Sequence, residues 1–238
     1  MPYTASFRAA LAGGALVLAI AASSALANEP AKKSATPGWG GTVQSAAGTT
    51  AAAFDERQVA LINKVGGYFN TLTTLKGNFQ QTDPDKKPSK GKFFLQKPGM
   101  FRFDYARPSR KVIVSDGRFL AIQDHDLNTA DTYELDNTPF RVLLKADVDL
   151  TRDAKVLEVV ELPDSIVVTL QDKSPDTPGA IRLIMATGKD VVELKEWITY
   201  DAQGLETRVA VSDLTKGEPI DAALFKRESF STQKMQAN

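Results

Sequence analysis

The stretch from residue 91 to residue 140 constrains the fold most, because its apolar and polar side chains alternate in short runs. In one run, Phe101, Phe103 and Tyr105 fall on the same side of an extended chain, since successive side chains of a strand point to opposite faces. Turn residues separate the runs, and Asp116-Gly117 is a strong two-residue hairpin signal. The stretch therefore predicts a meander of antiparallel strands with one strongly apolar face.

Comparable runs continue toward the C-terminus, with no obvious internal repeat and no parallel crossover pattern. Short strands at this spacing are typical of an antiparallel barrel or sandwich. We expect about eleven strands among twelve candidate runs, at residues 75–81, 90–96, 100–105, 111–115, 118–124, 129–135, 156–162, 165–171, 180–185, 191–200, 205–214 and 225–230.

Two segments follow a helical pattern instead. Residues 54–71 form an amphipathic repeat, and Asp55 is a suitable N-cap for it. Residues 139–145 predict a short helix, with Thr138 as N-cap and Pro139 at the first helical position. The apolar positions of the longer repeat are Val59, Ile62, Val65, Gly66, Phe69 and Leu72.

The first 53 residues differ in composition from the rest. Residues 1–27 resemble a secretory signal, with a short basic start, an apolar run at 9–22 and the small-residue cleavage site Ala25-Leu26-Ala27. An uncleaved anchor is the alternative, disfavoured because the run is rich in Ala and Gly and no basic stop-transfer cluster follows it. Residues 28–53 read as a flexible linker. We expect one folded domain over residues 54–238.

Composition excludes several kinds of function. The chain has no cysteine, so it offers no disulfide, no thiolate metal site and no thiol nucleophile, and it has no cysteine after the leader to carry a lipid anchor. Its 29 basic and 29 acidic residues balance. Nucleic-acid binding needs a strongly basic surface, so we do not expect a nucleic-acid partner.

Enzyme chemistry finds little support in the sequence. His125 is the only histidine, and any catalytic triad or histidine metal site would depend on it. It stands in Asp124-His125-Asp126, between two expected strands, where an extended chain splays the side chains apart. We interpret this segment as a polar hairpin loop, and we predict no catalytic residue, no metal ligand and no cofactor. A glycosidase-type carboxylate pair is not singled out by any pattern, so that alternative stays open.

Large apolar side chains are concentrated in the first meander. Such a face can form an ordinary sheet core, or it can line a cavity that accepts an apolar ligand. Alternation alone leaves both possibilities open. The aromatic residues concerned are Phe79, Phe93, Phe94, Phe101, Phe103, Tyr105, Phe119 and Tyr133.

The order of short motifs resembles the periplasmic outer-membrane lipoprotein carrier family (LolA). The resemblance spans residues 54–230, and each motif is weak when taken alone. The motifs are Leu75-Lys76-Gly77-Asn78-Phe79-Gln80-Gln81, Gly91-Lys92-Phe93, the run KPGMFRFDY at 97–105, Pro108, Val114-Ser115-Asp116-Gly117, Thr138-Pro139-Phe140 and Asp221-Ala222-Ala223-Leu224-Phe225.

This resemblance implies a mainly β (α+β) fold, an unclosed antiparallel half-barrel of about eleven strands with a helical lid over an apolar cavity. It also implies a monomeric periplasmic carrier without enzymatic activity. Such a carrier takes acylated lipoproteins from an inner-membrane ABC transporter and delivers them to the outer membrane, in some cases to a lipoprotein receptor there. Because each buried acyl methylene is worth about 0.8 kcal/mol, acyl chains need such shielding in an aqueous compartment.

The site residues expected from alternation and resemblance are Lys97, Phe101, a set of cavity residues and a set of lid residues. The family usually has arginine where this chain has Lys97, and the resemblance implies that this residue holds the lid closed, although lysine lacks the planar fork of arginine. Phe101 matches an exposed aromatic used in lid or partner contact, with a core phenylalanine as the alternative. The expected cavity residues are Phe79, Phe93, Leu95, Phe103, Leu120, Ile122 and Tyr133, and the expected lid residues are Phe140, Leu143 and Leu144.

Two other functions compete with the carrier. A periplasmic lipid-sensing regulator, which would detect mislocalised lipoproteins, can be built on the same half-barrel fold, but such proteins usually carry a second domain that this chain has no room for. A hydrolase using His125 or a carboxylate pair is the other alternative, and an acyl or glycosyl hydrolysis that is lost in His125→Ala would support it.

Overall fold

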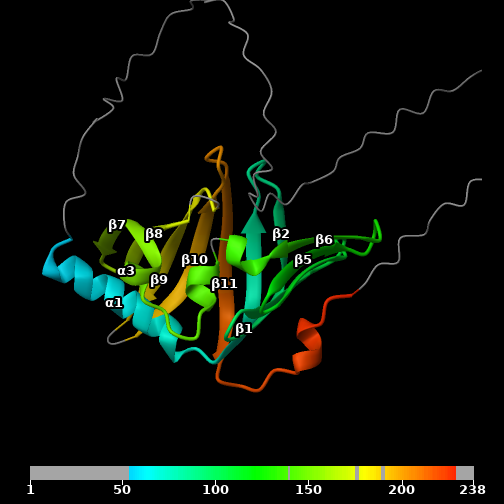
Figure 1. The fold of residues 1–238 in the computed structure, drawn as a ribbon, viewed down its shortest axis with the longest axis horizontal. Coiled ribbons are helices and arrows are strands. Elements are labelled where there is room, and N and C mark those ends of the chain that lie inside the picture. Colours follow the sequence, from blue (N-terminus) through cyan, green and yellow to red (C-terminus); the bar gives the residue numbers. More distant parts are fainter. Residues whose placement is uncertain (1–53, 139, 175–176, 189–190, 229–238) are drawn as a thin grey trace, which may run out of the picture.

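The computed structural model describes residues 54–138, 140–174, 177–188 and 191–228. Within these residues, one antiparallel sheet of eleven strands runs in the order β6-β5-β4-β3-β2-β1-β11-β10-β9-β8-β7, and it curves around a concave face (Figure 1). The end strands β6 and β7 are not paired with each other, so the sheet stays open. The predicted unclosed half-barrel is confirmed. The strands are β1 (Thr74–Thr82), β2 (Pro88–Gln96), β3 (Met100–Tyr105), β4 (Lys111–Asp116), β5 (Phe119–Asp124), β6 (Thr129–Glu134), β7 (Ala154–Leu162), β8 (Ser165–Asp172), β9 (Ala180–Thr187), β10 (Val192–Tyr200) and β11 (Glu206–Lys216).

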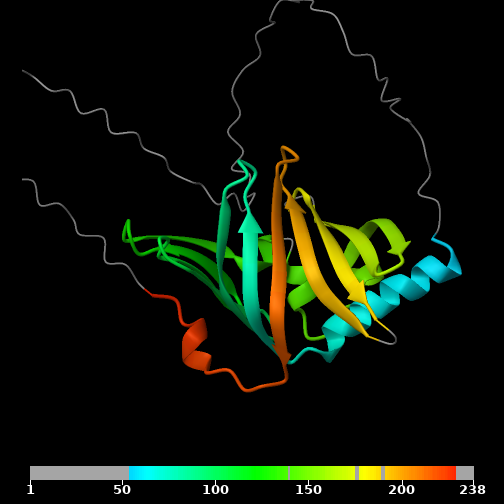
Figure 2. The ribbon, with the colours of Figure 1, turned by 180° about the vertical axis from the view of Figure 1, so that it is seen from behind.

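Two meanders meet at the centre of this sheet. Strands β1 to β6 form one and β7 to β11 form the other, and they join because the first strand pairs with the last, as in the pair Phe79 and Val211. Figure 2 shows β1 and β11 side by side from behind. Left-handed glycines make two of the predicted turns, with φ of +71° at Gly99 and +96° at Gly117. The connection from β6 to β7 carries the short helices that enter the concave side.

Helix α1 (Glu56–Thr71) starts as predicted. The Asp55 carboxylate accepts a hydrogen bond from the Gln58 backbone N–H at 2.7 Å, and the Gln58 side chain accepts one from the Asp55 N–H at 3.1 Å. This capping box satisfies two donors that the first turn leaves free. The helix buries Ile62, Val65, Tyr68 and Phe69 on the concave side, against β7, β8 and β10.

The expected helix over residues 139–145 is wrong in its start. A 3-10 turn, η1 (Leu135–Asn137), comes first, and α2 covers only Arg141–Leu144. The Thr138 hydroxyl donates backward to the Leu135 carbonyl at 2.8 Å, so it does not cap α2. Pro139 lies outside the described residues. A third helix, α3 (Leu150–Asp153), was not predicted, and the Asp149 side chain caps it by accepting from two backbone N–H groups.

The expected last strand is also wrong within the part of the chain that the structure describes. Its first residue, Phe225, belongs to a 3-10 helix, η2 (Ala222–Phe225), and is 2% exposed. This helix packs on the convex side of β3 and β4. Side chains on this face bind the helix and the segment after it: Arg102 Nη1 donates to Leu224 O in the helix at 3.1 Å, and Gln123 Nε2 of β5 donates to Glu228 O beyond the helix at 2.8 Å. These side-chain hydrogen bonds hold residues 224–228 on the sheet, where backbone pairing was expected.

No helix among the described residues is both long enough and apolar enough to cross a membrane. The predicted leader (1–27) and linker (28–53) lie outside them.

Candidate functional site

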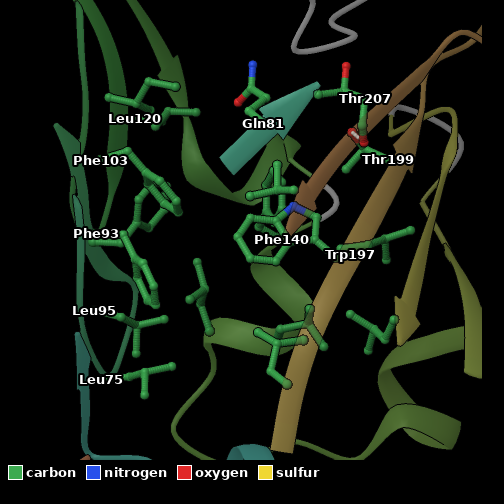
Figure 3. Close-up of a pocket in the computed structure, with 18 of the residues that line it drawn as sticks. Leu75, Gln81, Phe93, Leu95, Phe103, Leu120, Phe140, Trp197, Thr199 and Thr207 are labelled. Atoms are coloured by element: carbon green, nitrogen blue, oxygen red, sulfur yellow. Dashed lines mark hydrogen bonds between the residues drawn. The ribbon is translucent and has the colours of Figure 1, made fainter. Parts of the chain in front are cut away.

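A cavity lies on the concave face of the sheet, beneath α1 and α2 (Figure 3). Its free volume is about 150 Å³. A void of this size accommodates a molecule such as benzene, so the walls have to move before a long acyl chain can enter. The residues that line the cavity include Phe69, Leu72, Leu75, Gln81, Phe93, Leu95, Lys97, Phe101, Phe103, Tyr105, Leu120, Phe140, Leu143, Leu144, Ile181, Leu183, Leu194, Trp197, Thr199, Asp201, Thr207 and Val209.

The wall from the first meander is built of interlocked rings. Phe93 stacks on Phe103 with ring centroids 5.7 Å apart, and Phe101 meets Phe103 edge-on at 5.9 Å. Pairs of this geometry add to the energy of burial and restrict ring movement. We call Phe93, Phe101 and Phe103 the aromatic wall.

The wall from the second meander consists mainly of branched aliphatic side chains. Ile181, Leu183, Leu194 and Val209 line it, and we call these four the aliphatic wall. Trp197 stands among them and reaches across the cavity. Its ring is 6.1 Å from that of Phe103 and 6.5 Å from that of Phe140, edge-on in both cases.

The structure brings together nine of the twelve predicted site residues around this cavity. Phe79 does not line it: its ring packs edge-on against Phe103 and Tyr105, with centroids 5.2 and 5.0 Å apart. Ile122 packs against the neighbouring cluster around Leu120, and Tyr133 lies half-buried on β6. The nine that line the cavity are Phe93, Leu95, Lys97, Phe101, Phe103, Leu120, Phe140, Leu143 and Leu144. Their role in ligand binding stays a prediction.

The expectation of an exposed aromatic at Phe101 is wrong. The side chain is 6% exposed and packs in a cluster with Ile113, Leu120 and Leu144. It faces the cavity because it shares one strand face with Phe103, so the lid covers both.

The sequence analysis missed the aliphatic wall and Trp197. A bulge between Leu194 and Glu196 shifts the register of β10, so Leu194 and Trp197 both face the cavity although they are three residues apart. Strict alternation would place them on opposite faces. The concentration of apolar residues in residues 180–200 was the available signal, but it could not tell which side of the sheet each residue faces.

Residues 140–153 carry α2 and α3 and border the cavity through Phe140, Leu143 and Leu144, and we call this segment the lid. Its first anchor is an ion pair in which the Arg141 guanidinium donates two hydrogen bonds of 2.6 Å to Asp172 at the end of β8. The Asp172 side chain is 1% exposed. Burial alone would raise the pKa of Asp172, but the bonds from Arg141 and from the Ser174 N–H hold this pKa below its usual value.

Backbone contacts fasten the lid at two more places. The Asn70 side chain of α1 donates to Val148 O at 2.9 Å and accepts from Val148 N at 2.8 Å. The Gly99 N–H, in the β2–β3 turn, donates to Leu144 O at 3.0 Å.

Lys97 connects the same turn to α1 and forms no hydrogen bond with the described residues of the lid. Its Nζ donates to the Phe69 carbonyl at 2.9 Å, near the C-terminal end of α1. Burial lowers the pKa of Lys97, and Asp147 opposes that effect. Lys97 thus links α1 to the β2–β3 turn, and this turn contacts the lid through Gly99.

The two ends of the cavity differ in polarity. The lysine end, beside the β2–β3 turn, is formed by Leu75, Leu95 and Lys97. The opposite end, which we call the aspartate end, lies where β1 stops and β10 turns into β11, and it contains Gln81, Thr199, Asp201 and Thr207. Figure 3 shows Leu75 and Leu95 at one end of the pocket, and Gln81, Thr199 and Thr207 at the other.

No catalytic centre stands out among these side chains. No group of three or more histidine, cysteine or acidic residues able to hold a metal occurs in the described residues. His125 lies outside the cavity, at the turn between β5 and β6, with its Nδ1 3.8 Å from a Glu228 carboxylate oxygen.

Comparison with known proteins gives a consistent result. The LolA family model, described as "Outer membrane lipoprotein carrier protein LolA", matches residues 70–228. Outer-membrane lipoprotein carrier proteins of Pseudomonas paraeruginosa and Pseudomonas fluorescens are 26% and 28% identical, covering 76% and 75% of this chain and 88% and 87% of their own. A solved LolA superfamily protein from Nitrosomonas europaea aligns with a TM-score of 0.43 at 11% identity, over 71% of this chain and 96% of that one.

Proposed function

This chain belongs to the LolA family of outer membrane lipoprotein carrier proteins, and on this premise we propose that it carries lipoproteins through the periplasm with their acyl chains held in the cavity. It receives them from an inner-membrane ABC transporter and delivers them to the outer membrane, where a lipoprotein receptor is a candidate acceptor. The protein acts as a monomer after export and removal of residues 1–27, and it catalyses no reaction.

The single observation that carries the proposal is the apolar cavity beneath a fastened lid. Burial of apolar surface supplies affinity for acyl chains without directional bonds, so release needs only a change in the shape of the cavity. The free volume of about 150 Å³ is too small for a long acyl chain. Loading then requires the lid to move so that Leu144 leaves its cluster with Phe101 and Leu120.

The proposal is tested with inner-membrane vesicles that contain a lipoprotein and its ABC transporter. The purified protein is added with ATP, the vesicles are sedimented, and the supernatant is separated by size. We expect a soluble complex of one lipoprotein with one carrier. A matched lipoprotein whose lipidated cysteine is replaced by serine cannot be acylated, and it serves as the control.

Two outcomes contradict the carrier function. Absence of lipoprotein from the supernatant would remove the central claim. Release of acylated and non-acylated forms in equal amounts would show that the acyl chains are not what the protein binds.

A further inference from the structure

Charge is distributed unequally along the cavity. Of the described residues that line it, only Lys97 and Asp201 are charged, and they lie at opposite ends. The Lys97 ammonium already donates to the Phe69 carbonyl at 2.9 Å. The Asp201 carboxylate forms no ion pair with the described residues, so its charge is compensated by backbone N–H groups alone.

Asp201 leaves one of its two carboxylate oxygens unused. Oδ1 accepts hydrogen bonds of 2.8 Å from the N–H groups of Gln203 and Leu205, and these bonds shape the β10–β11 turn. Oδ2 is buried and has no hydrogen-bond partner among the described residues, and the whole residue is only 7% exposed. A buried charged acceptor without a donor is costly, so such an atom indicates a partner that is absent from the free protein.

The surrounding side chains at the aspartate end are also polar. Gln81 is 5% exposed and is held in place, because its Oε1 accepts from the Tyr105 hydroxyl at 2.7 Å and its Nε2 donates to Asp83 at 2.6 Å. Thr199 Oγ1 donates to Thr207 O at 3.4 Å. These groups would solvate a polar head, whereas the cavity wall between the aspartate end and Lys97 is mainly apolar.

We propose that the aspartate end binds the head of the acyl ligand through a nitrogen that donates to Asp201 Oδ2, an ammonium or an amide N–H, and that the chain extends toward the lysine end. This inference rests on the proposed carrier function. From Gln81 to Leu75, strand β1 spans about 20 Å, which gives the length available to an extended chain. The fastened lid and α1 then cover the apolar tail, and the head remains near the β1–β2 and β10–β11 turns.

Head-group preference tests the first half of the inference. Binding of 1-N-phenylnaphthylamine is measured by fluorescence and is displaced at pH 7, below the micelle concentration, by dodecylamine, N-dodecylacetamide, dodecanol or dodecanoate. We expect the two nitrogen donors to displace the probe at about tenfold lower concentration than dodecanoate, the change that one hydrogen bond to a charged group supplies.

Asp201→Asn is the informative variant. Asparagine keeps an Oδ1 acceptor for the Gln203 and Leu205 N–H groups, so the turn is retained, but it presents an N–H where Oδ2 was. The preference for nitrogen heads should then disappear or reverse in favour of dodecanoate. Asp164→Asn, in the β7–β8 turn away from the cavity, is the matched control and should keep the wild-type order. Thermal melting of both variants checks that they fold.

Chain direction is tested with Trp197 as the reporter, in a Trp39→Phe background. Trp197 pairs with Val209, and Val209 pairs with Gln81, so the backbone of Trp197 is level with the aspartate end. Octadecylamine brominated at carbons 6 and 7 should therefore quench its fluorescence more strongly than the same amine brominated at carbons 11 and 12.

The alternative results of the quenching and displacement experiments each contradict a different part of the inference. Stronger quenching by the 11,12-bromines would reverse the direction of the chain. Equal displacement by all four amphiphiles, unchanged in Asp201→Asn, would mean that an internal donor such as the buried Thr177 hydroxyl, itself unpartnered here, satisfies Asp201. Both results leave the carrier function intact, whereas failure of every amphiphile to displace the probe would count against both proposals.

Discussion

The two walls of the cavity hold the lid in different ways. At the aliphatic side, Arg141 makes two charge-assisted bonds of 2.6 Å to a buried Asp172. At the aromatic side, a single backbone bond of 3.0 Å joins Gly99 to Leu144. Charged, bidentate bonds are roughly twice as strong as a neutral bond between amide groups. The lid is therefore attached firmly to the second meander and weakly to the first.

From this difference we infer where the cavity would open. The rings of the aromatic wall interlock, so this wall resists deformation. The lid also keeps its two bonds to α1 through Asn70 and Val148. Movement is easiest where Leu144 meets the β2–β3 turn, and there the lid can separate from the aromatic wall while Arg141 remains bound.

The largest effect is expected from breaking the strong attachment. Arg141→Met leaves Asp172 buried without its partner, and we expect the free energy of unfolding to fall by about 3 kcal/mol. Urea denaturation followed by circular dichroism measures it. Arg208→Met is the matched control, because the Arg208–Glu196 pair is exposed and its loss should cost less than about 1 kcal/mol.

A double variant tests whether the unpaired charge of Asp172 causes the loss of stability. Arg141→Met with Asp172→Leu removes both charges, and it should recover most of the lost stability because no buried carboxylate is left alone. If the single variant is as stable as the wild type, the lid is not anchored at β8, and the comparison of the two attachments fails.

Sequence reasoning described the first meander much better than the second. The pattern around Phe101 and Phe103 is regular, and period-two alternation placed both on the cavity face, although Phe79, Ile122 and Tyr133 of the same meander do not line the cavity. In the second meander a bulge beside Leu194 broke the alternation and hid Trp197. Local pattern cannot reveal such a register shift, since the shift depends on pairing with β9.

The polar contacts of the site were even less predictable. Arg141 and Asp172 are 31 residues apart, and neither stands out in composition. Thr138 looked like a helix cap, but its hydroxyl binds the turn before it. Lys97 was identified through its position in a family motif, and the motif could not show that its partner is α1 and not the lid.

A smaller effect is expected from the contact between Phe140 of the lid and Trp197. Phe140→Ala removes a half-buried ring opposite Trp197, and the free energy of unfolding should fall by about 1–2 kcal/mol. The affinity for 1-N-phenylnaphthylamine should rise, because the lost ring leaves space for a ligand. Phe119→Ala is the control: this half-buried ring lies outside the cavity, under Arg118 and Arg227, so stability should fall without a gain in probe affinity. Equal probe binding in both variants would mean that Phe140 does not limit access.

The smallest effect on stability, and the sharpest test of the weak side, concerns Lys97. Lys97→Leu should lower the free energy of unfolding by about 1 kcal/mol or less, because burial already disfavours the ammonium and the Phe69 carbonyl keeps a second donor in the Leu72 N–H. Dissociation of 1-N-phenylnaphthylamine, measured by stopped flow, should nevertheless become about threefold faster, since the β2–β3 turn loses its tie to α1 where the lid separates. Lys92→Leu, at an exposed position on β2, should leave the rate unchanged, and Lys97→Arg should slow it because a guanidinium offers more donors to the carbonyls nearby. Equal dissociation rates for Lys97→Leu and the wild type would show that this residue has no part in holding the cavity closed.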